Sequence, residues 1–302
     1  MTRRGWVLFA LMSVVWGIPY LMIKVADEGV STPVVVFART ALGALVLLPL
    51  ALRSGGLGTV LRHWRPVLAF ALLEIIGPWG LLSDAERRLS SSMTGLLIAA
   101  VPVISVLVAR VTGDAERIGA KRWVGLALGL GGVALLAAPD LKGGDARAIG
   151  EVLLTAVGYA TAPAIAARRL KEVPSLPLTA FCLGLAALVY LPWAVVARPH
   201  EIPSGRVLAS LAGLGLICTA LAFNLFFALI HEAGPSRALV ITYVNPAVAV
   251  TAGVAFLGEP LTAAIVGSFF LVLAGSVLAT ARSPRGPEDS PRTAPAGAQH
   301  VN

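Results

Sequence analysis

Residues 36–49 read VFARTALGALVLLP, an apolar run of helical length with one charged residue, Arg39, inside it. An arginine at membrane depth costs ~2.5–3.5 kcal/mol even on the most lenient insertion scale. What this arginine does depends on the kind of helix that carries it. The composition of the whole chain indicates that kind.

The chain is too apolar for an ordinary soluble domain. Of its 302 residues, 57% are apolar and 13% are charged, whereas soluble domains carry about 25% charged residues. The mean hydropathy of +0.83 agrees, so the composition indicates an integral membrane protein. The net charge of +8 comes from lysines and arginines between the apolar runs, and no recognition motif accompanies them, which argues against nucleic-acid binding.

Apolar runs long enough to cross a bilayer, which takes ~20 residues each, occur ten times. We number them as spans one to ten: 6–26, 32–52, 66–83, 93–111, 122–138, 150–167, 178–197, 207–230, 237–257 and 262–281. A signal peptide is the rival interpretation of the first run. That run is too long and lacks a small-residue cleavage site, so we expect a spanning helix.

The loop charges predict the orientation. With the N-terminus inside, 16 of the 24 lysines and arginines fall in cytoplasmic segments and 6 in outer segments. The positive-inside rule therefore favours both termini in the cytoplasm of a protein of the cell membrane. Residues 284–302 are rich in proline and small polar residues, which is typical of a disordered cytoplasmic tail.

Two stretches carry the same marks at nearly the same spacing. VPVISVLVARVTGDAERIGAKRW starts at Val101, and NPAVAVTAGVAFLGEPLTAAIVG starts at Asn245. Each has a proline near its start, a serine ten residues before that proline, and a glutamate in the loop that follows. These are Pro102, Ser92 and Glu116 in the first stretch and Pro246, Ser236 and Glu259 in the second.

This pattern predicts an internal repeat of five helices. Because five is odd, the second copy must insert upside down, as in many secondary transporters. We expect a first repeat over 1–138, an outer linker over 139–148 and a second repeat over 149–283. The fold class is then an all-α membrane protein of ten helices in two inverted halves.

Several segments resemble the EamA-type repeats of the drug/metabolite transporter superfamily: SVVWGIPYLMIKV, VVFARTALGALVLLP, AERRLSSSMTGLLIAAVPV and LVITYVNPAVAVTAGVAFLGEPLT. The resemblance covers roughly residues 6–281. It implies a ten-helix carrier with a central cavity that exports amino acids or related metabolites. Span seven departs from the pattern because it has no arginine that corresponds to Arg39, so the first half is expected to carry most of the polar recognition.

Arg39 and Glu74 are the strongest candidates for a transport role. Arg39 is expected to face a polar cavity and to meet a substrate carboxylate or an acidic side chain. The alternative is that it snorkels to the outer surface. Glu74 lies near the middle of span three, too deep for its short side chain to reach water, so we expect it to bind or relay a proton. It could also pair with Arg39 or with a substrate amine, or form a structural hydrogen bond. Its counterpart in the second repeat is Cys218.

Lys24 ends span one, where it can pair with Asp27 or Glu28, while the family resemblance leaves a gating or substrate role open. Other polar or aromatic side chains within spans are candidates for lining the pathway: Trp16, Trp79, Tyr159, Asn224, Tyr243 and Asn245. Prolines within the spans bend their helices and are candidate hinges: Pro19, Pro102, Pro163 and Pro246. The small-residue stretch GLALGLGG at 125–132 is expected to pack closely, including at a dimer contact, and is not a phosphate loop.

The two cysteines, Cys182 and Cys218, lie inside apolar runs and form neither a disulfide framework nor a metal motif. We therefore expect no metal and no cofactor. The sequence predicts a secondary transporter, monomeric or homodimeric, that moves a small polar metabolite by alternating access in exchange for protons, and the family resemblance implies export of amino acids or related metabolites. Efflux of drugs or cations and transport of sugar-type metabolites are the alternatives. A channel or a membrane enzyme is disfavoured, since no catalytic cluster accompanies the four histidines.

Overall fold

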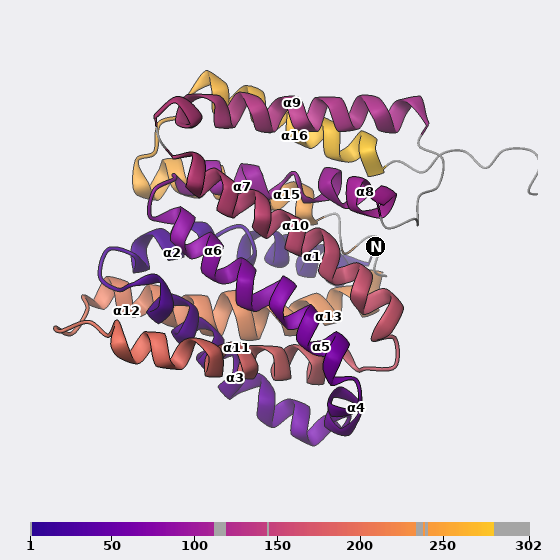
Figure 1. Cartoon of the computed structure of the whole chain (residues 1–302), viewed down its shortest axis with the longest axis vertical. Helices are drawn as coiled ribbons and strands as arrows, with labels where there is room; N and C mark the ends of the chain where they lie inside the picture. Colours follow the sequence, from indigo (N-terminus) through magenta and orange to yellow (C-terminus); the bar gives the residue numbers. More distant parts are fainter. Residues whose placement is uncertain (1, 112–118, 144, 234–237, 239–240, 281–302) are drawn as a thin grey trace, which may run out of the picture.

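The computed structural model describes residues 2–111, 119–143, 145–233, 238 and 241–280, and these residues form helices joined by short turns (Figure 1). No strand occurs in these ranges. Seven helical segments are long and apolar enough to cross a membrane, and three shorter apolar helices accompany them. The prediction of an all-α membrane protein is confirmed. The expected tail, residues 284–302, lies outside the described residues.

Spans one and four are broken in the middle. Span one comprises α1 (Arg3–Val15) and α2 (Pro19–Ala26), and span four comprises α7 (Ser91–Ile98) and α8 (Val101–Val111). Pro19 opens α2 and Pro102 is the second residue of α8, which fits a residue that cannot donate to the preceding helical turn. These two candidate hinges therefore lie at real breaks. Pro163 and Pro246 lie inside unbroken helices.

Spans three and eight each contain a π-helical segment between two α-helices. Span three consists of α5 (Trp64–Ala71), η1 (Leu72–Ile76) and α6 (Gly77–Glu86). Span eight consists of α12 (Gly205–Ala212), η2 (Gly213–Leu221) and α13 (Ala222–Ala233). π-Helical turns widen the backbone and are frequent at functional sites. The sequence comparison aligns Glu74 with Cys218, and the structure has both residues inside these π segments.

The remaining helices are unbroken. Their bounds are α3 (Thr32–Ser54), α4 (Leu57–Arg62), α9 (Ala120–Gly143), α10 (Ala146–Arg169), α11 (Ser175–Val196), α15 (Ile241–Leu257) and α16 (Ala263–Thr280). Apart from the short α4, each corresponds to one predicted span. The largest boundary error that matters for function is in span three, which was predicted to end at 83 and continues to Glu86.

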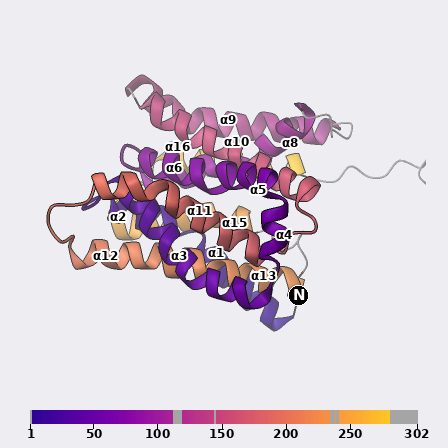
Figure 2. The same cartoon turned by 60° about the horizontal axis from the view of Figure 1, so that its bottom comes forward.

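The two predicted repeats interleave rather than form separate bodies. The strongest helix pairs are α9 with α16, α3 with α11, α6 with α10, α7 with α15, α3 with η2, α1 with α13, and α8 with α10, and each pair joins a span from the first half with one from the second. Figures 1 and 2 show α9 and α16 together along one edge of the bundle, while α3 and α11 lie on the opposite side. Any site in the interior is therefore shared by both halves.

Close backbone contact between α9 and α16 explains the small residues of span five. A Cβ atom added at Gly275 would lie 2.3 Å from the backbone nitrogen of Gly129, and one at Gly132 would lie 2.8 Å from a methyl group of Val272. The stretch at 125–132 thus packs against a helix of the same chain, as glycines that let helices approach closely commonly do.

Candidate functional site

Arg39 projects from α3 into the interior, and only 8% of its surface is exposed. Its Nε donates a hydrogen bond of 3.1 Å to the Thr219 hydroxyl on η2. Its guanidinium carbon lies 3.7 Å from the centre of the Trp79 ring on α6, a cation–π geometry. The arginine does not snorkel to the surface, because its charge is held between one helix of the second half and one of the first.

Thr219 is oriented as a hydrogen-bond acceptor by the π-helix that carries it. Its hydroxyl donates a hydrogen bond of 2.8 Å to the carbonyl oxygen of Leu214, five residues earlier. Since the hydroxyl has only one proton to donate, its lone pairs remain for the Arg39 Nε. Span eight therefore contributes a fixed neutral partner to a cation of span two.

No carboxylate pairs with Arg39 in the described part of the chain. The titratable side chains that act electrostatically on it are Tyr159, Cys218 and Tyr20. The predicted alternative of an Arg39–Glu74 ion pair is not observed. A buried guanidinium with one hydrogen bond and one aromatic partner keeps donors for an anionic group, because it has five N–H groups in a planar fork that matches a carboxylate.

Glu74 lies in η1, half-buried, and its Oε2 is buried without a hydrogen-bond partner among the described residues. Tyr159 on α10 and Cys182 on α11 are within its electrostatic reach. The end of η1 is fixed by Tyr190, whose hydroxyl donates a hydrogen bond of 2.7 Å to the carbonyl oxygen of Ile76. This hydroxyl satisfies a carbonyl beside the π turn and leaves the Glu74 carboxyl without a structural hydrogen bond.

Lys24 does not pair with Asp27 or Glu28, and that expectation was wrong. Its Nζ donates to the backbone carbonyls of Glu86, at 2.5 Å, and Leu89, at 2.8 Å. The last carbonyls of a helix have no partner within the helix and carry partial negative charge, so the ammonium group satisfies the C-terminus of α6.

The two acids expected near Lys24 have other cationic partners. Asp27 lies 3.3 Å from Arg87, and Glu28 lies 3.6 Å from Arg206. Asp27 directly follows α2, and its side chain is 7% exposed. Burial raises the pKa of Asp27 to about 7, and the nearby charges of Arg87 and Lys24 oppose that rise without cancelling it.

Glu86 is a candidate that sequence analysis missed. It is the last residue of α6, fully buried, and neither carboxyl oxygen has a hydrogen-bond partner in the described ranges. Its neighbours Asp84, Arg87 and Arg88 make the segment look like a solvated loop. The signal that could have found it is helical spacing: Glu86 follows Trp79 by seven residues, which is two helical turns on the same face.

Glu259 joins the second half to the first at the same end of the bundle. Its carboxylate accepts hydrogen bonds from the backbone N–H groups of Ser91, at 2.7 Å, and Ser92, at 2.9 Å, and from the Ser92 hydroxyl, at 2.5 Å. An acid at a helix N-terminus satisfies free N–H groups and complements the helix dipole. Gly253 leaves the space for it, since a Cβ atom there would lie 2.3 Å from the Glu259 Oε2.

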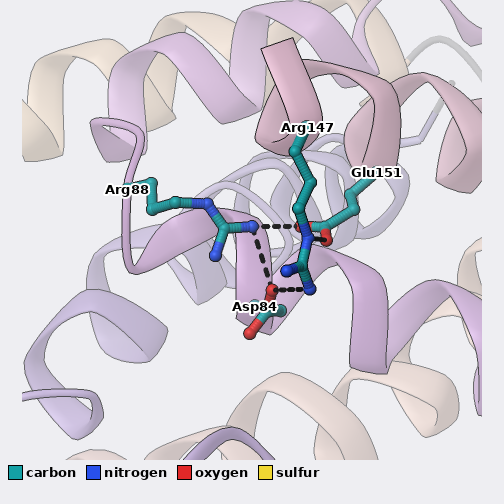
Figure 3. A network of polar contacts seen from close by, with 4 residues as sticks. All are labelled: Asp84, Arg88, Arg147 and Glu151. Atoms are coloured by element: carbon teal, nitrogen blue, oxygen red, sulfur yellow. Dashed lines mark hydrogen bonds and ion pairs between the residues drawn. The ribbon is translucent and has the colours of Figure 1, made fainter. Parts of the chain in front are cut away.

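A four-residue ionic network joins α6 to α10 nearby (Figure 3). Arg88 lies 2.9 Å from Asp84 and 2.6 Å from Glu151, and Arg147 lies 2.8 Å from Glu151 and 3.4 Å from Asp84. The network contains two positive and two negative side chains, so its net charge is zero. Networks at exposed positions contribute little stability pair by pair, but this one holds the end of α6 that carries Glu86 against a helix of the second half.

The other candidate aromatic residues occupy mixed environments. Trp16 packs against Phe226, with ring centres 4.7 Å apart, so it belongs to an aromatic cluster between spans one and eight. Tyr159 is half-buried and within electrostatic reach of Arg39 and Glu74. Tyr243 lines a small cavity of about 10 Å³ between α7, α15 and α16, which is too small for a metabolite.

The two candidate amides make bonds to the backbone. The Asn224 side chain is exposed and donates a hydrogen bond of 2.8 Å to the Ala220 carbonyl of its own span. Among the described residues it forms no hydrogen bond with another candidate site residue. Asn245, with its amide nitrogen directed at the neighbouring carbonyls, donates to Ile241 on α15, at 2.9 Å, and to Ser13 on α1, at 3.2 Å. It links spans nine and one.

The structure thus brings together Arg39, Trp79, Tyr159 and Glu74 in the interior, with Tyr20 and Thr219 as partners that sequence analysis did not name. In the described ranges, no three histidine, cysteine or acidic side chains are arranged to hold a metal ion. Both cysteines are buried and free. This arrangement is suited to binding a polar molecule with an anionic group.

Comparison with known proteins identifies the family. The EamA-like transporter family matches residues 3–138 and again residues 147–281. The chain is 29% identical over 266 residues to the uncharacterized inner membrane transporter YedA of Escherichia coli K12, covering 84% of this chain and 83% of YedA. It is 24% identical over 286 residues to the uncharacterized transporter YvbV of Bacillus subtilis, covering 93% and 92%.

A solved crystal structure supports the fold. It superposes with a TM-score of 0.63 at 19% sequence identity, over 93% of this chain and 97% of that one. At this identity the likeness concerns the fold alone. Taken with the family match over both halves, the apolar helices and the polar interior, it leads to one conclusion: the chain belongs to the EamA-like transporter family and is a multi-pass transporter of small molecules in the cell membrane.

Proposed function

We propose that this protein is a secondary transporter that exports a small metabolite bearing a carboxylate, an amino acid or a close relative, in exchange for protons. The observation that carries the proposal is Arg39, a buried guanidinium with no acidic partner in the described part of the chain. The loop charges favour both termini in the cytoplasm, and in that orientation Lys24, Glu86 and Glu259 lie at the outer end.

A substrate carboxylate is the partner that best explains the cost of burying Arg39. A lone charge inside a protein is strongly unfavourable, whereas a bidentate arginine–carboxylate pair recovers much of that cost. Thr219 and Trp79 hold the guanidinium from two sides, which reduces the entropy lost on binding. Tyr20 and Tyr159 lie near enough to act on its charge and supply polar groups for the remainder of a zwitterion.

Glu74 is the proposed proton-binding group near the middle of the membrane. Its Oε2 has no hydrogen-bond partner in the described ranges, and a carboxylate in that state is costly unless it holds a proton or meets a cation. In the empty transporter Glu74 holds a proton, and it releases that proton when substrate binds. Each transport cycle therefore moves a proton as well as the substrate.

The alternating movement is assigned to the breaks of spans one and four. Residues around Pro19 and Pro102 connect helical pieces that can tilt relative to each other, which matches the use of discontinuous helices in transporters built from inverted repeats. In this proposal the two parts that move relative to each other are the repeats over 1–138 and 149–283.

The test is transport by the purified full-length protein in lipid vesicles. Each of the standard amino acids is offered as a radiolabelled probe, beside the amine that remains when its carboxyl group is removed. We expect saturable counterflow of at least one amino acid, no transport of its amine, and loss of counterflow in Arg39→Ala. Arg62→Ala is the matched control, because Arg62 is an exposed arginine paired with Glu172.

A second candidate function is efflux of organic cations, which the unpartnered Glu74 carboxyl favours. The same experiment separates the two. Transport of amines without their parent amino acids, retained in Arg39→Ala and lost in Glu74→Gln, would replace the carboxylate proposal with the cation one.

A further inference from the structure

Glu86 is buried more completely than Glu74, the proposed proton-binding group near the middle of the membrane. No part of its surface is exposed, and neither Oε1 nor Oε2 has a hydrogen-bond partner among the described residues. A buried carboxylate without a hydrogen-bond donor is strongly unfavourable, while the neutral acid is far less so. The closed arrangement of this end of the bundle therefore favours Glu86 with a proton attached.

The surroundings provide a cation that can stabilise the other state. The charged or titratable side chains acting on Glu86 are Lys24 and Tyr20 on α2, Asp27 directly after α2, and Glu259 in the turn between α15 and α16. The Lys24 ammonium lies 2.5 Å from the backbone carbonyl of Glu86 itself. The positive charge of Lys24 also acts on the Glu86 carboxyl group and favours its ionised form.

Three other acids at this end are already engaged on at least one oxygen. Asp27 pairs with Arg87, and Glu259 is bound to the N-terminus of α7. From α10, Glu151 belongs to the ionic network with Arg88 and Arg147 (Figure 3). Glu86 is distinguished from these three by having no partner on either oxygen.

Two tyrosines connect Glu86 with the interior site. Tyr20 is within electrostatic reach of Glu86, Arg39 and Tyr159, and Tyr159 is within reach of Arg39 and Glu74. Glu74 and Glu86 are twelve residues apart on one span, or about 18 Å along a helix. That separation is too long for direct proton transfer, whereas Tyr20 acts electrostatically on Glu86 and Tyr159, and Tyr159 acts on Glu74.

We propose that Glu86 is the outer proton-binding residue of the transport cycle and that Tyr20 and Tyr159 carry the proton between Glu86 and Glu74. A proton from the outer solution adds to the Glu86 carboxylate when this end is open. On transfer, Glu86 gives its proton to the Tyr20 oxygen, Tyr20 passes its own hydroxyl proton to Tyr159, and Tyr159 passes its own to the Glu74 carboxylate. One proton moves, and both tyrosines end neutral.

This inference rests on the proposed function, so its test separates coupling from transport itself. Wild-type, Glu86→Gln and Glu172→Gln proteins are placed in vesicles with an equimolar mixture of radiolabelled standard amino acids as the probe. Two fluxes are compared: exchange of label at equal pH, and accumulation driven by a pH gradient. Glu172 is an exposed carboxylate at the other end of the bundle and is the matched control.

We expect the ratio of gradient-driven accumulation to exchange to fall at least tenfold in Glu86→Gln and to stay at the wild-type value in Glu172→Gln. An unchanged ratio in Glu86→Gln would overturn the inference. If the wild-type protein exchanges none of the probes, the proposed function itself fails, which is a different result.

A second measurement applies if Glu86→Gln loses both fluxes. The infrared difference spectrum of the protein between acidic and alkaline pH contains the C=O band of each carboxyl group that loses a proton. We expect Glu86→Gln to remove one such band from the folded protein and Tyr20→Phe to leave it in place while slowing gradient-driven accumulation. A spectrum identical to that of the wild type would contradict proton binding at Glu86.

Discussion

Spans three and eight, one from each half, share a π-helical distortion but differ in their chemistry. Span three carries Glu74, Trp79 and Glu86, whereas span eight has Cys218 at the position of Glu74 and uses Thr219 as a neutral acceptor for Arg39. The backbone feature recurs and the charged side chains do not. The same helical plan therefore supports different side-chain chemistry in the two halves.

The same division holds for the breaks and the contacts. Spans one and four of the first half are broken, while their counterparts α10 and α15 continue through Pro163 and Pro246. The second half contributes Thr219 and Glu259, each of which fixes a group of the first half.

The largest effect is expected from exchanging the guanidinium while keeping its charge. Arg39→Lys removes the planar fork, so transport should fall about 100-fold, which corresponds to ~2.7 kcal/mol. Thr219→Val removes only the neutral acceptor from span eight and should reduce transport about tenfold or less. Initial rates of counterflow measure both. If Thr219→Val proved as severe as Arg39→Lys, the second half would be part of the recognition site and not its support.

The next effect concerns the contact between the halves. Gly275→Ala places a Cβ atom 2.3 Å from the Gly129 nitrogen, and overpacking of this kind destabilises by about 1–3 kcal/mol. Because the obstacle is backbone, we expect the upper end of that range and a clearly lower thermal unfolding temperature in detergent. Gly131→Ala is the control, since no atom lies within 4 Å of its added Cβ. Equal unfolding temperatures for the two variants would show that α9 and α16 can separate freely.

A smaller effect is expected at the acid that links the halves. Glu259→Gln keeps the shape but loses the charge that complements the N-terminus of α7, which should destabilise the protein by about 1.5 kcal/mol. Hydrogen exchange of the Ser91 and Ser92 amides should increase in the same variant. Unchanged protection of these amides would contradict the hydrogen bonds described above.

The last effect is expected at Asp27, and it changes with pH. Its pKa is about 7 in the folded protein and 3.8 for the free group, so between these values the folded state holds a proton that the unfolded state has lost. The contribution of Asp27 to stability therefore decreases as pH rises from about 4 to about 7, with a slope of at most ~1.4 kcal/mol per pH unit. Asp27→Asn should flatten this part of the curve of unfolding temperature against pH. A curve that keeps its wild-type slope would rule out the raised pKa.

The membrane class, the approximate positions of the spans and the two main interior candidates could be predicted from the amino-acid pattern alone. Runs of about 20 apolar residues are forced to become helices because a bilayer offers no partner for backbone N–H and C=O groups. A charged residue inside such a run is costly wherever it points, which is why Arg39 and Glu74 stand out without coordinates. The proline positions of spans one and four likewise indicated where helices bend.

Which polar groups contact each other could not be predicted from the sequence, because it depends on how the helices pack. Lys24 binds the carbonyls of Glu86 and Leu89 rather than a neighbouring acid, and Thr219, 180 residues away in sequence, is the hydrogen-bond partner of Arg39. Glu86 lies among charged neighbours in a segment that resembles a loop, and it is buried only because helices distant in sequence cover it. Burial and partnership depend on the packing of whole helices, which local composition does not encode, so the predicted outer proton-binding residue emerged only from the folded chain.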